Sequence, residues 1–138
     1  MFETIQIAAQ YSFETIQPYA TRDKEFVLTC NIGTNSGNAF IWTRNNVGVV
    51  TVRISDCFTA DIGQGLSSSY KYNCTTSNKR YNLIIPATRI NSEGGYRWRC
   101  EDSGGGGSSS TYTLQFYSES LINSSFIIWA QGLYIVHN

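Results

Sequence analysis

The sequence contains four cysteines, and disulfide formation is the chemistry that their number and spacing favour. Cys30, Cys57, Cys74 and Cys100 form an even set, and no two of them have the Cys-x-x-Cys spacing of redox catalysis or tight zinc binding. Disulfides form in oxidising compartments. We therefore expect paired cysteines in an extracellular protein, either secreted or displayed at the cell surface.

Catalysis has little support in the residue types present. The only histidine, His137, is the penultimate residue, so no Ser-His-acid or Cys-His arrangement can form around a fixed imidazole. The acidic residues do not form a pattern that is typical of glycoside hydrolysis or of metal binding. We expect a protein that is not an enzyme, with no catalytic residues, no metal and no cofactor.

Two asparagines match the acceptor pattern for N-glycosylation. Asn73 begins an Asn-Cys-Thr triplet, and Asn123 begins an Asn-Ser-Ser triplet. A cysteine in the middle position lowers the occupancy expected at Asn73. Both residues are candidate glycan acceptors if the protein is extracellular.

The length and charge of the chain restrict its architecture and its partners. Its 138 residues suit one domain with extensions at its ends. Charged residues make up 14% of the sequence and cancel to zero net charge, so no overall field attracts nucleic acid or anionic lipid. Any partner must therefore be recognised by local groups.

Apolar and polar residues alternate in many short segments, a pattern with the period of β-strands. In one of them Phe26, Leu28 and Cys30 share a face, and the segment Asn45-Asn46-Val47-Gly48 is expected to turn the chain between two others. The expected strands lie within 13–17, 26–30, 40–44, 49–53, 70–74, 81–85, 96–100 and 112–116. Short strands with regular turns predict an antiparallel sandwich or barrel.

The spacing of three residues gives this pattern a more specific interpretation. Trp42 lies twelve residues after Cys30, and Cys100 lies seventy residues after Cys30. This spacing resembles the Cys, Trp and Cys framework of V-set domains in the immunoglobulin superfamily. The resemblance covers residues 14–118. It implies an all-β, immunoglobulin-like, two-sheet antiparallel sandwich of the V type, with Cys30 and Cys100 joined between the sheets and the core tryptophan Trp42 packed against them.

The range 14–118 leaves one segment at each end of the chain. Residues 1–13 are expected to be an N-terminal extension, and residues 119–138 an irregular C-terminal tail. The opening residues lack the basic and long apolar regions of a signal peptide, so we expect a fragment or an incorrect first exon. The apolar segment 121–136 contains polar residues and is shorter than the roughly 20 residues of a membrane span. It could be a truncated anchor, an extra strand or a read-through tail.

The resemblance is incomplete before the second cysteine of the framework and in the last strand. Trp98 stands where the family has its corner tyrosine, and Glu93 and Gly95 lie one position upstream of the family's acid and glycine. The last strand lacks the Phe-Gly-x-Gly bulge, so pairing of the antigen-receptor kind is not expected. The glycine and serine run 104–110, at the position of the F–G loop, is expected to be a spacer rather than a contact loop.

Beside this framework, Cys57 and Cys74 remain. We expect them to form an additional disulfide that joins the region after strand C′ to strand D. The alternative is a free thiol that pairs with another chain.

By the same resemblance, one surface of the sheet is a candidate contact site. Arg97 and Arg99 alternate with buried positions and should project from the outer surface of the C–C′–F–G sheet, near Thr43, Thr113 and Gln115. Arginine is enriched in interfaces, so we predict that these residues bind a partner. An ordinary solvated strand face is the alternative.

The resemblance implies an extracellular recognition module that binds a protein or a glycan. A structural immunoglobulin domain within a larger adhesion or matrix protein is the alternative function. A third interpretation, an intracellular domain of the muscle type, requires reduced cysteines.

Overall fold

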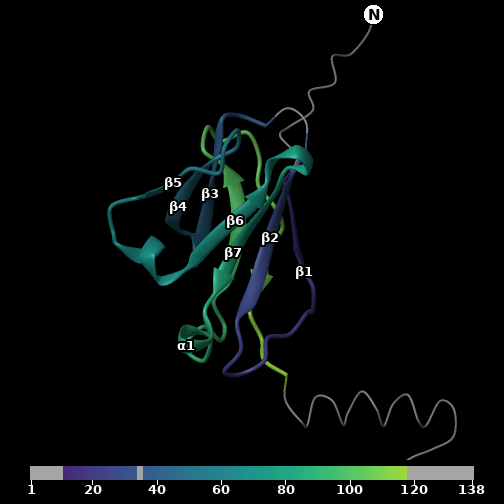
Figure 1. Cartoon of the computed structure of the whole chain (residues 1–138), viewed down its shortest axis with the longest axis vertical. Coiled ribbons are helices and arrows are strands. Elements are labelled where there is room, and N and C mark those ends of the chain that lie inside the picture. Colours follow the sequence, from purple (N-terminus) through teal and green to yellow (C-terminus); the bar gives the residue numbers. More distant parts are fainter. Residues whose placement is uncertain (1–10, 34–35, 118–138) are drawn as a thin grey trace, which may run out of the picture.

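The computed structural model describes residues 11–33 and 36–117, which form two antiparallel β-sheets (Figure 1). The four-stranded sheet has the order β1 (Tyr11–Thr15), β2 (Phe26–Ile32), β7 (Arg80–Ile85) and β6 (Lys71–Thr75). The five-stranded sheet has the order β5 (Thr59–Asp61), β4 (Val47–Arg53), β3 (Ala39–Arg44), β8 (Arg97–Asp102) and β9 (Tyr112–Thr113). Three short helices, η1 (Leu66–Ser69), η2 (Thr76–Asn78) and α1 (Ala87–Ile90), lie in the connections.

The predicted all-β, two-sheet sandwich is confirmed, and the alternation along the strands is its cause. The core side chains come from alternate positions of facing strands, because successive residues of a strand point to opposite faces. Buried positions on the central strands include Leu28, Phe40, Trp42, Leu83 and Trp98, each with no exposed surface. The expected C-terminal tail, Asn123 and His137 lie outside the described residues.

Both predicted disulfides are present. Cys30 on β2 bonds to Cys100 on β8, and this bond joins the two sheets through the centre of the core. Trp42 is opposite Cys100 in the register of β3 and β8 and is fully buried. Under the chain-entropy model, closing a loop of 70 residues stabilises the fold by roughly 4 kcal/mol.

The second disulfide lies at the edge of the sandwich. Cys57 follows β4 and bonds to Cys74 on β6, the edge strand of the four-stranded sheet. Both cysteines are half-buried. This bond therefore links the two sheets at one side, outside the core.

The first strand begins at Tyr11, before the predicted domain boundary at residue 14. Tyr11 is buried, its ring lies 6.2 Å from that of Phe40, and its hydroxyl donates to Asp102 across 2.7 Å. After β1 the chain crosses to the other sheet, where Ala20 forms a parallel bridge with Phe116. Contacts with the second sheet therefore extend the sandwich to Tyr11.

The β3–β4 hairpin turns within the predicted segment 45–48, but at its first two residues, so β4 begins at Val47 rather than at Val49. Asn45 and Asn46 have φ angles of 53° and 66°, the left-handed conformation that a two-residue hairpin turn requires and that asparagine tolerates. The register set by the turn pairs Arg44 with Val47 and Thr43 with Gly48, and a bulge between Trp42 and Thr43 then shifts it so that Trp42 pairs with Val50. The turn and the bulge together determine how β4 pairs with β3.

Candidate functional site

The two ends of the sandwich are built from different connections. One end contains the β2–β3, β4–β5, β6–β7 and β8–β9 connections, and we call it the open end (Figure 1). The opposite end contains the β3–β4 turn and α1, and we call it the closed end. Tyr70 lies there too, because its hydroxyl bonds Arg44 and Glu93. Each end holds a cluster of polar side chains, and the two clusters differ in how deeply they are buried.

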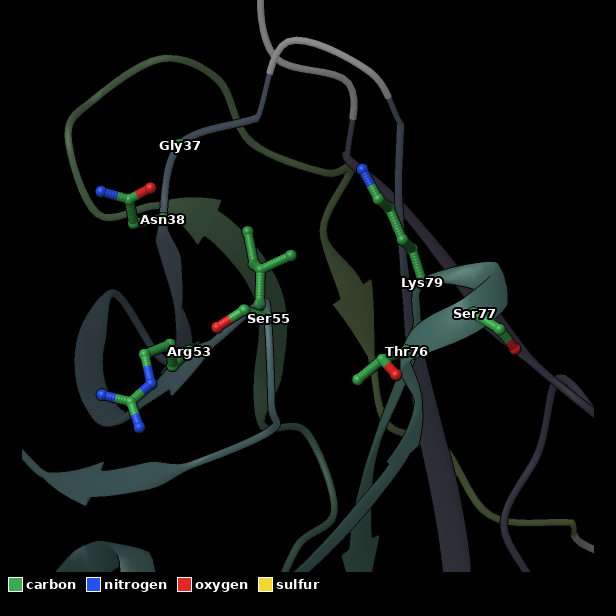
Figure 2. Close-up of a pocket in the computed structure, with 8 residues that line it drawn as sticks. Gly37, Asn38, Arg53, Ser55, Thr76, Ser77 and Lys79 are labelled. Carbon is green, nitrogen blue, oxygen red and sulfur yellow. The ribbon is translucent and has the colours of Figure 1, made fainter.

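A groove of about 600 Å³ lies at the open end. Figure 2 shows Asn38 and Arg53 on one side, Thr76 and Lys79 on the other, and Ser55 between them. The complete lining is Gly37, Asn38, Arg53, Ile54, Ser55, Thr76, Ser77 and Lys79. Because its sides come from different sheets, the groove crosses the gap between them.

The base of the groove is attached to the core through Ile54. This residue is 8% exposed, and its N–H donates to the carbonyl of Asn38 across 2.9 Å. Its own carbonyl accepts a hydrogen bond from the hydroxyl of the buried Tyr81. These bonds fix the backbone on one side of the groove.

Arg53 contributes a positive charge that is already paired. Its Nε and Nη2 atoms donate to the two carboxylate oxygens of Asp56 at 2.8 and 2.6 Å. This bonding lowers the pKa of Asp56 to about 2. The guanidinium also lies 5.0 Å from the centre of the Phe58 ring, which is 59% exposed. Arg53 is therefore held in place and offers its remaining N–H groups.

Lys79 provides a second cation on the facing side. Its backbone has a φ of 53°, its N–H donates to the carbonyl of Thr76, and its carbonyl accepts from Ile32. Among residues 11–33 and 36–117, the Lys79 ammonium forms no ion pair. The groove thus combines one unpaired cation with hydroxyl and amide groups, which suits a polar partner.

Asp102 fixes the conformation of the neighbouring loops. Its carboxylate accepts from the Tyr11 hydroxyl at 2.7 Å and from the backbone N–H groups of Gly37, Gly104 and Gly106 at 3.0 to 3.1 Å. The Tyr11 hydrogen bond is the largest cause of a lowered pKa of Asp102. The glycine and serine run that the sequence predicts to be a spacer therefore follows a defined path beside the groove.

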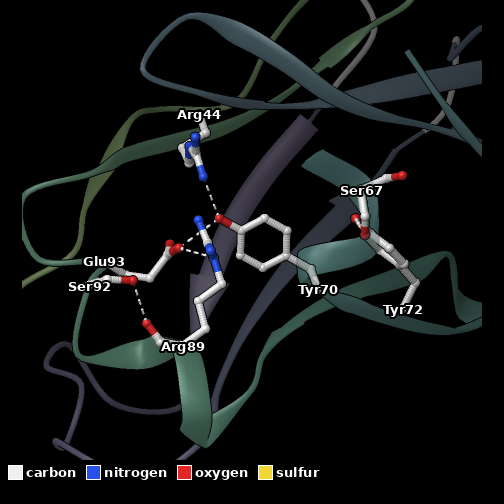
Figure 3. A network of polar contacts seen from close by, with 7 residues as sticks. All are labelled: Arg44, Ser67, Tyr70, Tyr72, Arg89, Ser92 and Glu93. Atoms are coloured by element: carbon white, nitrogen blue, oxygen red, sulfur yellow. Dashed lines mark hydrogen bonds and ion pairs between the residues drawn. The ribbon is translucent and has the colours of Figure 1, made fainter. Parts of the chain in front are cut away.

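At the closed end, a buried carboxylate organises a polar network (Figure 3). Glu93 has no exposed surface, and its Oε2 accepts from Arg89 Nε at 2.8 Å and from the Tyr70 hydroxyl at 2.7 Å. The Tyr70 oxygen in turn accepts from Arg44 at 2.8 Å. Burial is the main cause that raises the pKa of Tyr70 to about 12. The network joins three separate segments, which contain Arg44, Tyr70 and residues 89–93, and has a structural role.

Trp98 lies beside this network. It is fully buried, and its ring meets that of Tyr70 edge-on at 5.1 Å. Within the described part of the chain, its indole Nε1–H has no hydrogen-bond partner. Trp98, which by the resemblance stands at the corner position, therefore makes no side-chain hydrogen bond within the described residues, and the hydroxyl that bonds Glu93 comes from Tyr70.

The residues predicted to bind a partner lie on the five-stranded sheet. Arg97 is paired with Thr113 in the register of β8 and β9, and Arg99 with Thr43 in the register of β8 and β3. Arg97, Thr113 and Gln115 are exposed. Gln115 follows β9, and its carbonyl accepts from Ala20.

Two of these residues offer little contact surface. Thr43 is only 2% exposed, and its hydroxyl donates to the Arg99 carbonyl at 3.4 Å. Arg99 is half-buried and lies 3.5 Å from a carboxylate oxygen of Glu101. The surface available on this face is therefore centred on Arg97, Thr113 and Gln115.

Sequence reasoning did not identify the groove, Asp102 or Tyr70. An aspartate before a serine and several glycines is a pattern for turns in which the carboxylate binds following N–H groups, so it could have identified Asp102. No local pattern marks Ser55, Thr76 or Lys79, because they meet only after the two sheets pack.

Comparisons with other proteins leave the family open. A scan against protein-family models finds no matching family, and a search of the curated proteins finds no match. In residues 11–33 and 36–117, no group of three or more His, Cys, Asp or Glu side chains could hold a metal ion. Within the same ranges, no helix has the length and apolar character needed to cross a membrane. The two disulfides are compatible with an extracellular location.

Proposed function

We propose that the chain is an extracellular, V-type immunoglobulin-like recognition module that binds a protein or glycan partner at its open end. The observation that carries this proposal is the groove between the sheets, where exposed hydroxyl, amide and cationic groups converge. Binding residues are concentrated in loops that a rigid scaffold positions. Here the disulfides and the buried core provide that scaffold.

The strand order supports the immunoglobulin-like part of the proposal. The sheets β1-β2-β7-β6 and β5-β4-β3-β8-β9 correspond, strand for strand, to the A-B-E-D and C″-C′-C-F-G sheets of V-type domains. In that correspondence Cys30 lies on strand B, Trp42 on strand C and Cys100 on strand F. These are the positions that the resemblance implies.

The same correspondence supports binding at the open end. The β2–β3, β4–β5 and β8–β9 connections take the places of the B–C, C′–C″ and F–G loops, with which variable domains bind their partners. The first two line the groove directly, and Asp102 ties the third to the first. Polar groups that are already positioned lose less entropy on binding than mobile ones.

The face that contains Arg97 is the second candidate surface. Arg97, Thr113 and Gln115 are exposed there, whereas Thr43 is buried and Arg99 is engaged by Glu101. The groove offers more polar groups with a concave arrangement, so we place the partner there.

Binding to a glycan array and to intact cells tests the proposal, with the chain displayed as a multimer. We expect a Ser55→Ala, Ser77→Ala and Lys79→Ala variant to lose at least tenfold in affinity, equivalent to about 1.4 kcal/mol. The matched control is an Arg97→Ala, Thr113→Ala and Gln115→Ala variant, which should bind as the unmodified chain does.

Two results would contradict the proposal. Loss of binding in the control variant alone would assign recognition to the strand face. Absence of binding to every glycan and cell type would favour a structural immunoglobulin domain. Free thiols at all four cysteines, found by non-reducing peptide mapping of the native protein, would exclude the extracellular location.

A further inference from the structure

We infer that Asn73 is an N-glycosylation site, and that its glycan covers the edge of the four-stranded sheet. The inference rests on the proposed extracellular location, because the modification takes place in the secretory pathway. It follows from where the structure puts the Asn-Cys-Thr triplet, which the sequence alone identifies only as an acceptor pattern.

The strand separates the glycan position from the disulfide. On β6, Lys71, Asn73 and Thr75 are exposed, whereas Tyr72 and Cys74 are half-buried on the other face. Cys74 therefore reaches Cys57 from the face opposite to Asn73. The cysteine within the triplet and the glycan do not compete for space in the folded protein.

The hydrogen bonding of Asn73 involves the oxygen of its amide. Its Oδ1 accepts a hydrogen bond from Asn82 Nδ2 at 2.7 Å, and the Oδ1 of Asn82 accepts from the Thr29 hydroxyl at 2.7 Å. In the described part of the chain, Nδ2 of Asn73 has no hydrogen-bond partner. The acceptor oxygen is thus used internally, and the nitrogen that receives the sugar is available.

The bond formed by the modification is compatible with this network. Asn73 Nδ2 bonds to the anomeric carbon of an oligosaccharide that is donated from a lipid-linked diphosphate. The carbon–oxygen bond to the diphosphate breaks, the diphosphate leaves with the electron pair, and Nδ2 gives up one proton to a base. Oδ1 keeps its lone pairs, so the hydrogen bond from Asn82 is retained.

A glycan here would protect an exposed sheet edge. Among the strands of the described residues, β6 pairs only with β7, so its other side presents backbone groups that could pair with another chain. The surrounding outer face contains polar groups, with Asn82 beside Asn73 and an ion pair between Arg80 and Glu14. A hydrated oligosaccharide suits this surface and leaves the five-stranded sheet uncovered.

The test is peptide mapping of the full chain, secreted from glycosylating cells with an added leader and with Asn123→Gln to remove the other triplet. Treatment with an N-glycosidase in isotopically heavy water converts a modified asparagine to labelled aspartate. We expect labelled aspartate at position 73. Thr75→Ser should keep the label and Thr75→Ala should abolish it, while Asn82→Gln, outside any triplet, should keep it.

Unlabelled Asn73 in secreted chain with an intact Cys30–Cys100 bond would overturn the inference. The added leader brings the chain into the secretory pathway whatever its natural location, so this result would leave the proposed function standing. Conversely, a labelled Asn73 in a chain that binds no partner would contradict the proposed function alone.

Discussion

The two ends of the sandwich each contain one carboxylate that joins several segments, but they differ in burial and in their partners. At the closed end, Glu93 is fully buried and is bonded by the side chains of Arg89 and Tyr70. At the open end, Asp102 is half-buried and is bonded mainly by backbone N–H groups. The first arrangement excludes water, whereas the second holds loops around a groove that stays accessible.

Under the proposed function, this difference assigns stability to the closed end and recognition to the open end. A buried charge that loses its partners is costly, so the closed end tolerates little change. Exposed side chains cost little to replace, so the residues of the groove are free to be selected for a partner. The predictions below test that division, starting with the largest effect.

Removing the carboxylate at the closed end should have the largest effect. Glu93→Ala leaves the Tyr70 hydroxyl and the Arg89 guanidinium without their acceptor, and we expect a loss of about 3–5 kcal/mol in the free energy of unfolding. Chemical denaturation measures it. The exposed Glu25, replaced by alanine as the control, should change the value by less than about 0.5 kcal/mol. Equal losses in both variants would refute a special role for Glu93.

Opening the edge disulfide should destabilise the open end. The Cys57→Ala and Cys74→Ala double variant releases a loop of 17 residues, for which the chain-entropy model gives a loss of about 3 kcal/mol. Because Cys57 follows Ser55 closely, partner binding in the groove should weaken as well. Thermal unfolding and the binding assay measure the two effects. Unchanged binding would show that the groove does not depend on this bond.

Asp102→Asn should have a smaller effect that depends on pH. The pKa of Asp102 is lowered in the folded protein, so its stabilisation is present above the ordinary value of 3.8 and is lost as the pH falls through the folded pKa. We expect a loss of about 1 kcal/mol at neutral pH that shrinks towards zero in acid. Unfolding curves of both proteins from pH 7 to about pH 2 test this. A difference that stays constant with pH would exclude the charge as the cause.

Lys79→Ala should have the smallest effect on stability. Its ammonium is exposed, and its contacts to Thr76 and Ile32 are made by the backbone, which alanine keeps. The positive φ of 53° costs alanine no more than it costs lysine, so we expect a change within about 0.5 kcal/mol. Affinity for the partner should nevertheless fall. A large loss of stability would show that the Lys79 side chain supports the fold. It would contradict the division between a stabilising closed end and a binding open end.

The sequence was sufficient for most of the sandwich. Alternation located the central strands, because burial on one face of a strand repeats every second residue. The positions of Cys30, Trp42 and Cys100 indicated how the sheets meet, and the segment 45–48 indicated a turn, because asparagine and glycine tolerate turn conformations. The first strand was placed too late, since the contacts that hold Tyr11 come from Phe40 and Asp102.

The sequence by itself determined the period of the strands, the turns and the cysteine framework, since each depends on neighbours along the chain. Only the tertiary structure decided which polar residues act together. Lys79 faces Arg53 across the groove, and Glu93 meets Arg44 through Tyr70, although these residues are far apart in sequence. Polar side chains have no periodic pattern that reveals such partners. Their partners are set by the packing of two sheets, which local residue types do not specify.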